Sequence, residues 1–196
     1  MAKSGRMTLI DALNVLVDLR SDEVIVATMG SAREWVHLSS HPLDLIYLPS
    51  TMGGGVPLGL GLALAQPKRH VIVLSGDGSL LMNLGSLVTA AAHDAQNLTV
   101  VVVDNGVYEV TGGQKLVTAD RPVDLTKIAL AAGFATATEF DDLTTWQREA
   151  KKTLSQPGPR FVNLKVAPVQ DDYSVASPGP MAERMNKFKE SIGRDE

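Results

Sequence analysis

Two apolar segments rich in β-branched residues, 70–75 and 98–103, constrain the fold of this 196-residue chain most strongly. Neither alternates with polar residues, which is typical of parallel strands that are buried on both faces. The intervening residues 80–93 have the apolar spacing of a helix that would connect the two strands. A strand, a helix and a second strand in this order predict a parallel sheet in an α/β domain.

A polar cluster directly follows each of these strands, namely Gly-Asp-Gly-Ser at 76–79 and Asp-Asn-Gly at 104–106. Ligands of parallel α/β sheets bind outside the carboxyl ends of the strands, so Asp77 and Asn105 are expected to face each other across a crevice. A carboxylate, an amide oxygen and free glycine amides suit a Mg²⁺ ion that carries a phosphate. The pattern therefore predicts a magnesium-diphosphate site, whereas an isolated Gly-Asp-Gly would indicate only a turn whose aspartate caps a helix.

The two clusters resemble the signature of the thiamine diphosphate (ThDP) enzymes, in which Gly-Asp-Gly is followed after roughly 25 residues by a pair of asparagines. Here Asp104 replaces the first asparagine. The stretches GDGSLLMNLGSL and DNGVYEVTGGQ are most similar to the β subunit of sulfopyruvate decarboxylase and next to phosphonopyruvate decarboxylase, and the likeness extends over residues 24–166. The resemblance implies that Asp77, the Asn105 side chain and the Val107 carbonyl ligate Mg²⁺, while Asp104 turns away into a structural hydrogen bond.

The same resemblance implies cofactor contacts on two earlier turns. Gly30 and Ser31 would lie at the diphosphate, although Ser31 capping the following helix is an equally valid interpretation. In the glycine-rich run after the predicted strand 43–48, the Ser50 carbonyl and the Met52 amide would hydrogen-bond to the aminopyrimidine ring. The Met52 side chain would support the cofactor in its bent, V-shaped conformation. Core filling is the alternative interpretation for Met52, because methionine suits irregular gaps.

The loop 106–116 leaves the same edge of the sheet and is expected to line the crevice. Its Tyr108 and Glu109 are candidates for substrate binding or proton transfer, with a solvent-exposed loop position as the alternative. No residue of this chain is assigned as the catalytic group. The full set of residues expected to bind the cofactor is Gly30, Ser31, Ser50, Met52, Gly76, Asp77, Gly78, Ser79, Asn105, Val107 and Tyr108.

The rest of the chain completes one doubly wound parallel sheet with helices on both faces. Residues 1–167 are expected to form this single ThDP-binding domain of the α/β class. Residues 168–196 form an arm rich in Pro, Ser and Gly and then a helix, whose apolar stripe would cover the active site, a subunit contact or its own domain. The further strands are predicted at 23–27, 43–48, 134–138 and 160–166, and the further helices at 8–20, 32–38, 122–132 and 142–154.

Composition argues against several other classes of protein. The formal net charge of −4, without a basic run, argues against a nucleic-acid-binding surface. The chain has no cysteine, which excludes disulfides, thiolate metal sites and a cysteine nucleophile. Because the sequence shows neither an apolar run of about 18 residues nor a signal-peptide core, we expect a cytoplasmic protein without a membrane contact.

ThDP enzymes need a glutamate that hydrogen-bonds to the aminopyrimidine, and the family supplies it from a separate pyrimidine-binding domain. This sequence resembles only the diphosphate-binding domain, so the resemblance implies a hetero-oligomer in which a pyrimidine-domain (α) subunit completes the active site. The expected activity is decarboxylation of a small 2-oxo acid, with 3-sulfopyruvate and 3-phosphonopyruvate as the substrates of the most similar enzymes. A carboligase subunit resembling acetolactate synthase and a non-catalytic ThDP-binding or regulatory subunit are the alternatives.

Overall fold

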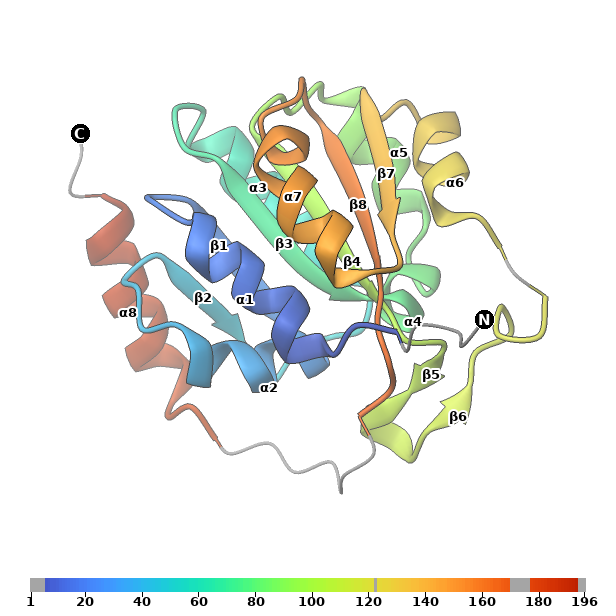
Figure 1. Cartoon of the computed structure of the whole chain (residues 1–196). Helices are drawn as coiled ribbons and strands as arrows, with labels where there is room; N and C mark the ends of the chain where they lie inside the picture. The colour runs from blue at the N-terminus through green and yellow to red at the C-terminus, as the bar shows by residue number, and fades with distance from the viewer. Residues whose placement is uncertain (1–5, 122, 170–176, 194–196) are drawn as a thin grey trace.

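The computed structural model describes residues 6–121, 123–169 and 177–193, which contain a six-stranded sheet (Figure 1). The strands lie in the order β2-β1-β3-β4-β8-β7, and every neighbouring pair is parallel. The parallel sheet predicted from the two apolar segments is therefore confirmed. The strands are β1 (Val24–Thr28), β2 (Asp44–Tyr47), β3 (Val71–Gly76), β4 (Leu98–Asp104), β7 (Thr136–Phe140) and β8 (Arg160–Lys165).

Helices cover both faces of this sheet, as expected for a doubly wound fold (Figure 1). Alternate strand residues point to opposite faces, so Val71 and Val73 join one apolar cluster while Ile72 and Leu74 join the other. Each fully buried aliphatic side chain contributes about 1.5–3 kcal/mol to stability. None of the helices within the described ranges combines the length and apolar character that a membrane crossing requires. One face carries α1 (Leu9–Leu19), α2 (Met29–Leu38) and α7 (Leu143–Leu154), and the other carries α3 (Gly55–Ala65), α5 (Gly85–Ala92) and α6 (Leu125–Ala132).

The predicted connecting helix 80–93 is wrong as a single helix, because the structure divides this region into α4 (Asp77–Leu81) and α5. The break lies at Asn83, whose amide donates to the Leu80 carbonyl at 2.9 Å, three residues back instead of four. The Asn83 side chain donates to the carbonyl of Gly53 at 3.0 Å. Asparagine is a weak helix former, and this contact to another segment favours the interruption.

The loop after β4 forms a short antiparallel hairpin that the sequence did not predict. Its strands are β5 (Val107–Tyr108) and β6 (Gln114–Lys115), with the 3₁₀ turn η1 (Glu109–Thr111) between them. Gly112 and Gly113 close the turn with φ values of +110° and +77°, which glycine adopts without strain. The hairpin therefore projects from the carboxyl edge of the sheet with a defined geometry.

The C-terminal helix α8 (Met181–Ile192) lies beside β2, the strand at one edge of the sheet (Figure 1). Phe188 of α8 belongs to the main apolar cluster and is only 7% exposed. The guanidinium of Arg184 donates to the carbonyls of Ile46 in β2 and of Leu48, which follows this strand. Of the three positions left open by the sequence, this helix occupies the one against its own domain. It covers a sheet edge that would otherwise expose unpaired backbone groups.

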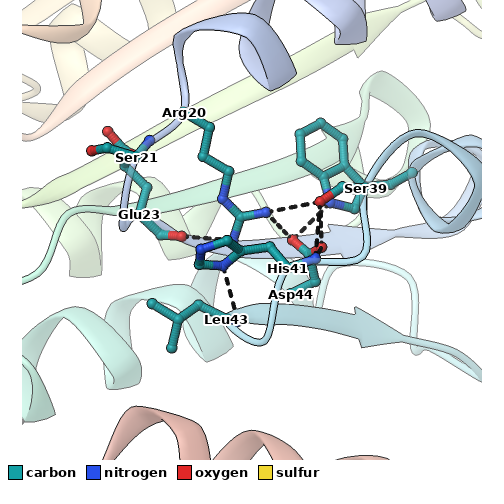
Figure 2. A network of polar contacts seen from close by, with 8 residues as sticks. Arg20, Ser21, Glu23, Ser39, His41, Leu43 and Asp44 are labelled. Carbon is teal, nitrogen blue, oxygen red and sulfur yellow. Dashed lines mark hydrogen bonds and ion pairs between the residues drawn. The ribbon is translucent and has the colours of Figure 1, made fainter.

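A buried polar network holds the opposite, amino end of the sheet (Figure 2). Asp44 begins β2, and its carboxylate forms an ion pair with Arg20 at the end of α1. The same carboxylate accepts from Trp35 Nε1 at 2.9 Å, from Ser39 Oγ at 2.6 Å and from the His41 amide at 3.0 Å. This network therefore joins α1, α2 and β2 at the end of the sheet remote from the polar clusters that follow β3 and β4.

Candidate functional site

A pocket opens at the carboxyl edge of the sheet, beside the central strands β1 and β3. The chain places β2 on one side of β1 and then adds β3 on the other side, and this reversal marks the usual binding crevice of an open α/β sheet. Ser50 is not a lining residue of this pocket, and Met29 lines it without having been predicted. The predicted residues that line it are Gly30, Ser31, Met52, Gly76, Asp77, Gly78, Ser79, Asn105, Val107 and Tyr108.

Asp77 is the first residue of α4 and is only 4% exposed. Its Oδ1 accepts from the Gly78 amide at 2.8 Å, and its Oδ2 accepts from the Gly106 amide at 2.7 Å. Burial raises the pKa of Asp77 to about 7 although both amide hydrogen bonds oppose this, and the neighbouring Asp104 carboxylate adds to the rise. A bound cation would favour the ionised carboxylate, so this environment suits a metal ligand.

Asn105 follows β4 and faces the same pocket. Its Oδ1 accepts from the Val107 amide at 3.0 Å, which fixes the side-chain amide and leaves a second lone pair on this oxygen. Gly106 has a φ of +77°, so the chain turns sharply between Asn105 and Val107. A carboxylate and an amide oxygen on one edge are the hard ligands that Mg²⁺ prefers, with its other positions open to phosphate and water.

Asp104 makes the expected structural hydrogen bond, but it also interacts with the Asp77 carboxyl. Its Oδ2 accepts from Lys165 Nζ at 2.5 Å and from Asn163 Nδ2 at 3.1 Å, and both partners lie on β8. Asn163 also donates to Glu139 at 2.8 Å. No local pattern pointed to these partners, because residues 104 and 165 become neighbours only through the parallel pairing of β4 with β8.

The turn between β1 and α2 carries features that suit an anion. The Ser31 hydroxyl is buried and, within the described residues, has no hydrogen-bond partner, so it does not cap α2. Met29 has a φ of +50°, a backbone conformation that is strained for a non-glycine residue and that occurs preferentially at functional sites. An orphaned hydroxyl beside the first amides of a ten-residue helix fits the oxygens of a phosphate group.

The glycine-rich segment before α3 is attached directly to the Gly-Asp-Gly turn. The Gly53 amide donates to Ser79 Oγ at 2.9 Å, and the Gly53 carbonyl accepts from Asn83 at 3.0 Å. Gly53 also has a φ of +82° and leaves no room for a Cβ, which would approach the Cβ of Asn83 to 2.7 Å. These contacts fix the backbone beside Met52, whose side chain faces the pocket. Asn83 is thus a positioning residue that sequence reasoning missed, and its one signal was an asparagine within an apolar helical pattern.

The hairpin after β4 closes one side of the pocket. The Tyr108 ring packs on Gly78 so tightly that a Cβ on the glycine would lie 2.5 Å from Cε1 of the ring. Glu109 points across to the α2 turn, where its Oε2 lies 3.2 Å from the position of a Cβ on Gly30. The other carboxylate oxygen of Glu109 accepts from the Val169 amide at 2.8 Å. Neither residue is therefore a freely solvated loop residue.

Comparison with known proteins agrees with this geometry. Residues 28–164 match the family model described as the thiamine pyrophosphate enzyme, C-terminal TPP binding domain. The sulfopyruvate decarboxylase subunit beta of Methanothermobacter thermautotrophicus is 38% identical over 167 residues, which are 85% of this chain and 85% of that protein. The phosphonopyruvate decarboxylase of Streptomyces viridochromogenes is 36% identical over 192 residues, which are 94% of this chain but only 47% of that protein.

A solved structure from Mycobacterium smegmatis, assigned to the thiamin diphosphate-dependent enzymes, shares the fold. It superposes with a TM-score of 0.70 at 24% identity and covers 84% of this chain and 32% of its own. At this identity the likeness bears on the fold alone. The present chain therefore spans about half the length of its Streptomyces relative and a third of this structural neighbour, but most of the length of the beta subunit.

Proposed function

This chain belongs to the thiamine pyrophosphate enzyme family, and we propose that it is the cofactor-diphosphate-binding subunit of a Mg²⁺-dependent 2-oxo acid decarboxylase. The observation that carries this proposal is the pairing of buried Asp77 with Asn105 at the carboxyl ends of β3 and β4. These residues would supply one carboxylate and one amide oxygen to the metal that the resemblance implies. The similarity to a sulfopyruvate decarboxylase subunit beta over 85% of both chains supports the same activity.

Asp77, Asn105 and the Val107 carbonyl would hold Mg²⁺, and the α2 turn with Ser31 would bind the diphosphate oxygens. Met52 would support the central part of the cofactor from the glycine-rich segment. When bound, thiamine diphosphate supplies a carbon nucleophile and then accepts the electrons released as carbon dioxide leaves the substrate. The remaining contacts would come from residues that also line the pocket, namely Gly30, Gly76, Gly78, Ser79 and Tyr108.

The glutamate that activates the aminopyrimidine would come from a second chain with a pyrimidine-binding domain. Two comparisons support this division: the matched family model is a C-terminal TPP binding domain, and one relative is named as a subunit beta of similar length. The Streptomyces relative is about twice as long as the present chain. The proposed assembly is a cytoplasmic hetero-oligomer whose cofactor lies between the two subunits.

The proposed substrate is a small 2-oxo acid with an anionic group on carbon 3, either 3-sulfopyruvate or 3-phosphonopyruvate. The names of the two relatives support this class of substrate. Such a substrate requires cationic donors because a sulfonate or phosphonate is bound most strongly by Arg and Lys side chains. Those donors would come from either subunit.

The decisive experiment is affinity capture of the tagged chain from its source cells in buffer containing Mg²⁺ and ThDP, followed by reconstitution with the copurifying chain. We expect a stoichiometric partner with a pyrimidine-domain glutamate, and ThDP-dependent release of carbon dioxide from sulfopyruvate or phosphonopyruvate. Asp77→Asn in the same complex is the matched control and should be inactive.

Three other results would overturn parts of this proposal. Formation of a carboligation product with an added aldehyde, in place of the free aldehyde product, would identify a carboligase subunit. ThDP binding without turnover of any 2-oxo acid would identify a non-catalytic cofactor-binding or regulatory subunit. Absence of ThDP binding in the reconstituted complex would contradict the assignment of the pocket itself.

A further inference from the structure

Two acidic residues lie side by side where the proposed metal site meets the sheet. Gly76 of β3 pairs with Val103 of β4, and the residues that follow are Asp77, which begins α4, and Asp104, which ends β4. The two side chains interact, because Asp104 contributes to the raised pKa of Asp77. Asp77 is 4% exposed and Asp104 is 9% exposed. Two neighbouring buried carboxylates repel each other when both are ionised, and a nearby positive charge stabilises the ionised pair.

Lys165 supplies a positive charge at this position. Asp104 pairs with Lys165 in the register of β4 and β8, and Lys165 Nζ lies 2.5 Å from Asp104 Oδ2. The Lys165 side chain is 25% exposed, and its ammonium also lies 3.8 Å from Oε2 of Glu139. Buried Asn163 donates to the same Asp104 oxygen at 3.1 Å, which adds direction but no charge.

We propose that Lys165 is a positioning residue for the metal site, which balances the charge of Asp104 and holds that carboxylate away from the cation. Asp77 then serves as the carboxylate ligand, and the site keeps the net charge that suits an ion bearing an anionic diphosphate. This inference rests on the proposed function, because it assigns Lys165 a role toward the Mg²⁺ and diphosphate of that site. Lys165 itself contacts neither group in this account.

If Lys165 balances charge, its loss should change the affinities for Mg²⁺ and for ThDP in opposite directions. Removing a positive charge beside the site should strengthen binding of a cation and weaken binding of an anion. A lysine that merely stabilised the ends of β4 and β8 would, when lost, weaken the binding of both. The two roles are therefore separable by measuring Mg²⁺ and ThDP affinity independently.

The experiment is a double-mutant cycle on Asp104→Asn and Lys165→Met in the full chain assembled with its partner subunit. Isothermal titration gives the affinity for Mg²⁺ alone and for ThDP at saturating Mg²⁺, and urea unfolding reports the stability of the full chain without ligands. We expect Lys165→Met to bind ThDP about tenfold more weakly and Mg²⁺ about threefold more tightly. Asp104→Asn should shift both affinities in the opposite directions, and the double variant should return both to within about threefold of wild type.

Two further variants serve as controls. Lys165→Arg keeps the positive charge and should retain the wild-type affinities. It tests the role of the charge even where Lys165→Met is poorly folded. Lys127→Met removes an exposed lysine that pairs with Asp124 at the start of α6 instead of Asp104, and it should change neither affinity. Weaker binding of both ligands by Lys165→Met, without recovery in the double variant, would overturn the inference and leave Lys165 a structural residue. If wild-type chain binds no ThDP, the proposed function fails, whereas normal wild-type binding with unchanged variants contradicts this inference alone.

Discussion

Asp77 Oδ2 accepts a hydrogen bond from the Gly106 amide at 2.7 Å, so the proposed metal ligand itself joins the ends of β3 and β4. Its Oδ1 meanwhile accepts from the Gly78 amide. Asp77→Ala should therefore remove Mg²⁺-dependent ThDP binding and also destabilise the chain by about 1–3 kcal/mol, because buried amides lose their acceptor.

Asp77→Asn separates the two effects. The amide oxygen keeps one of the two acceptor positions, so the loss of stability should be smaller than in Asp77→Ala, while Mg²⁺-dependent binding should still disappear. Titration calorimetry with ThDP at fixed Mg²⁺ and urea unfolding of the same samples give both quantities. Unchanged ThDP affinity in Asp77→Asn would contradict the assignment of Asp77 as the metal ligand.

Met52→Ala should impair turnover more than cofactor binding. The Gly53 amide donates to Ser79 and its carbonyl accepts from Asn83. These bonds fix the backbone beside Met52, which lines the pocket. A small displacement of the reacting group costs much in rate, and we expect kcat to fall about tenfold or more at saturating ThDP. ThDP affinity should change less than kcat because the diphosphate and metal contacts remain. Steady-state kinetics in the reconstituted complex, with ThDP as the varied ligand, tests this, and equal losses in both would argue for simple core filling.

The sequence was sufficient for the sheet and for the polar residues that follow its strands. Uninterrupted apolar runs identified β3 and β4, and strand order in a parallel sheet then brings Asp77 and Asn105 to one edge. Most predicted elements were confirmed with shifted ends. The first helix lies within its predicted range, and Thr8 Oγ1 caps it by accepting from the Asp11 amide. These features depend on local patterns and on a general rule about sheet edges.

Features that depend on long-range pairing could not be predicted. Lys165 approaches Asp104 only because β8 lies between β4 and β7 in the sheet, although β7 precedes β8 in the chain. Asn83 breaks its helix because a carbonyl from residue 53 is available as a partner. The apolar stripe of α8 predicted that the helix is buried on one side, but not against which surface. The contacts of Arg184 show that this surface is the β2 edge of the sheet. In each case the residue type permits several partners and only the folded topology selects one.

Asp44→Ala should destabilise the chain by about 3–5 kcal/mol, because it leaves a buried cation without its partner. The side chains of Arg20 and Asp44 are only 5% and 7% exposed, and the same carboxylate also binds Trp35 and Ser39 (Figure 2). Asp120→Ala is the matched control, because it breaks the exposed ion pair with Lys115 and should leave stability almost unchanged. Urea unfolding compares the two variants. Equal small effects would show that the network contributes little, and cofactor binding should persist because the network lies at the opposite end of the sheet.

Acid should destabilise the chain in part through His70. Burial, with a smaller effect of the Arg160 guanidinium, lowers the pKa of His70 to about 4 from the usual 6.5. The unfolded chain therefore binds a proton between pH 6.5 and 4 that the folded chain excludes, so the stabilising contribution is complete above pH 6.5 and is lost as pH falls toward 4. From this shift, the loss attributable to His70 between pH 7.5 and 4.5 is on the order of 2 kcal/mol.

The test is to measure the free energy of urea unfolding at both pH values in wild type, His70→Gln and His93→Gln. In the wild type, His70 Nε2 lies 2.7 Å from Thr99 Oγ1. A glutamine at position 70 keeps a polar group at this place, but it does not titrate. The pH-dependent loss of stability should therefore be smaller in His70→Gln than in wild type by that amount. His93→Gln is the control for replacing a histidine that is exposed. An identical pH dependence in all three proteins would mean that His70 binds its proton equally well in the folded and unfolded chains, and the acid sensitivity would then arise from carboxylates.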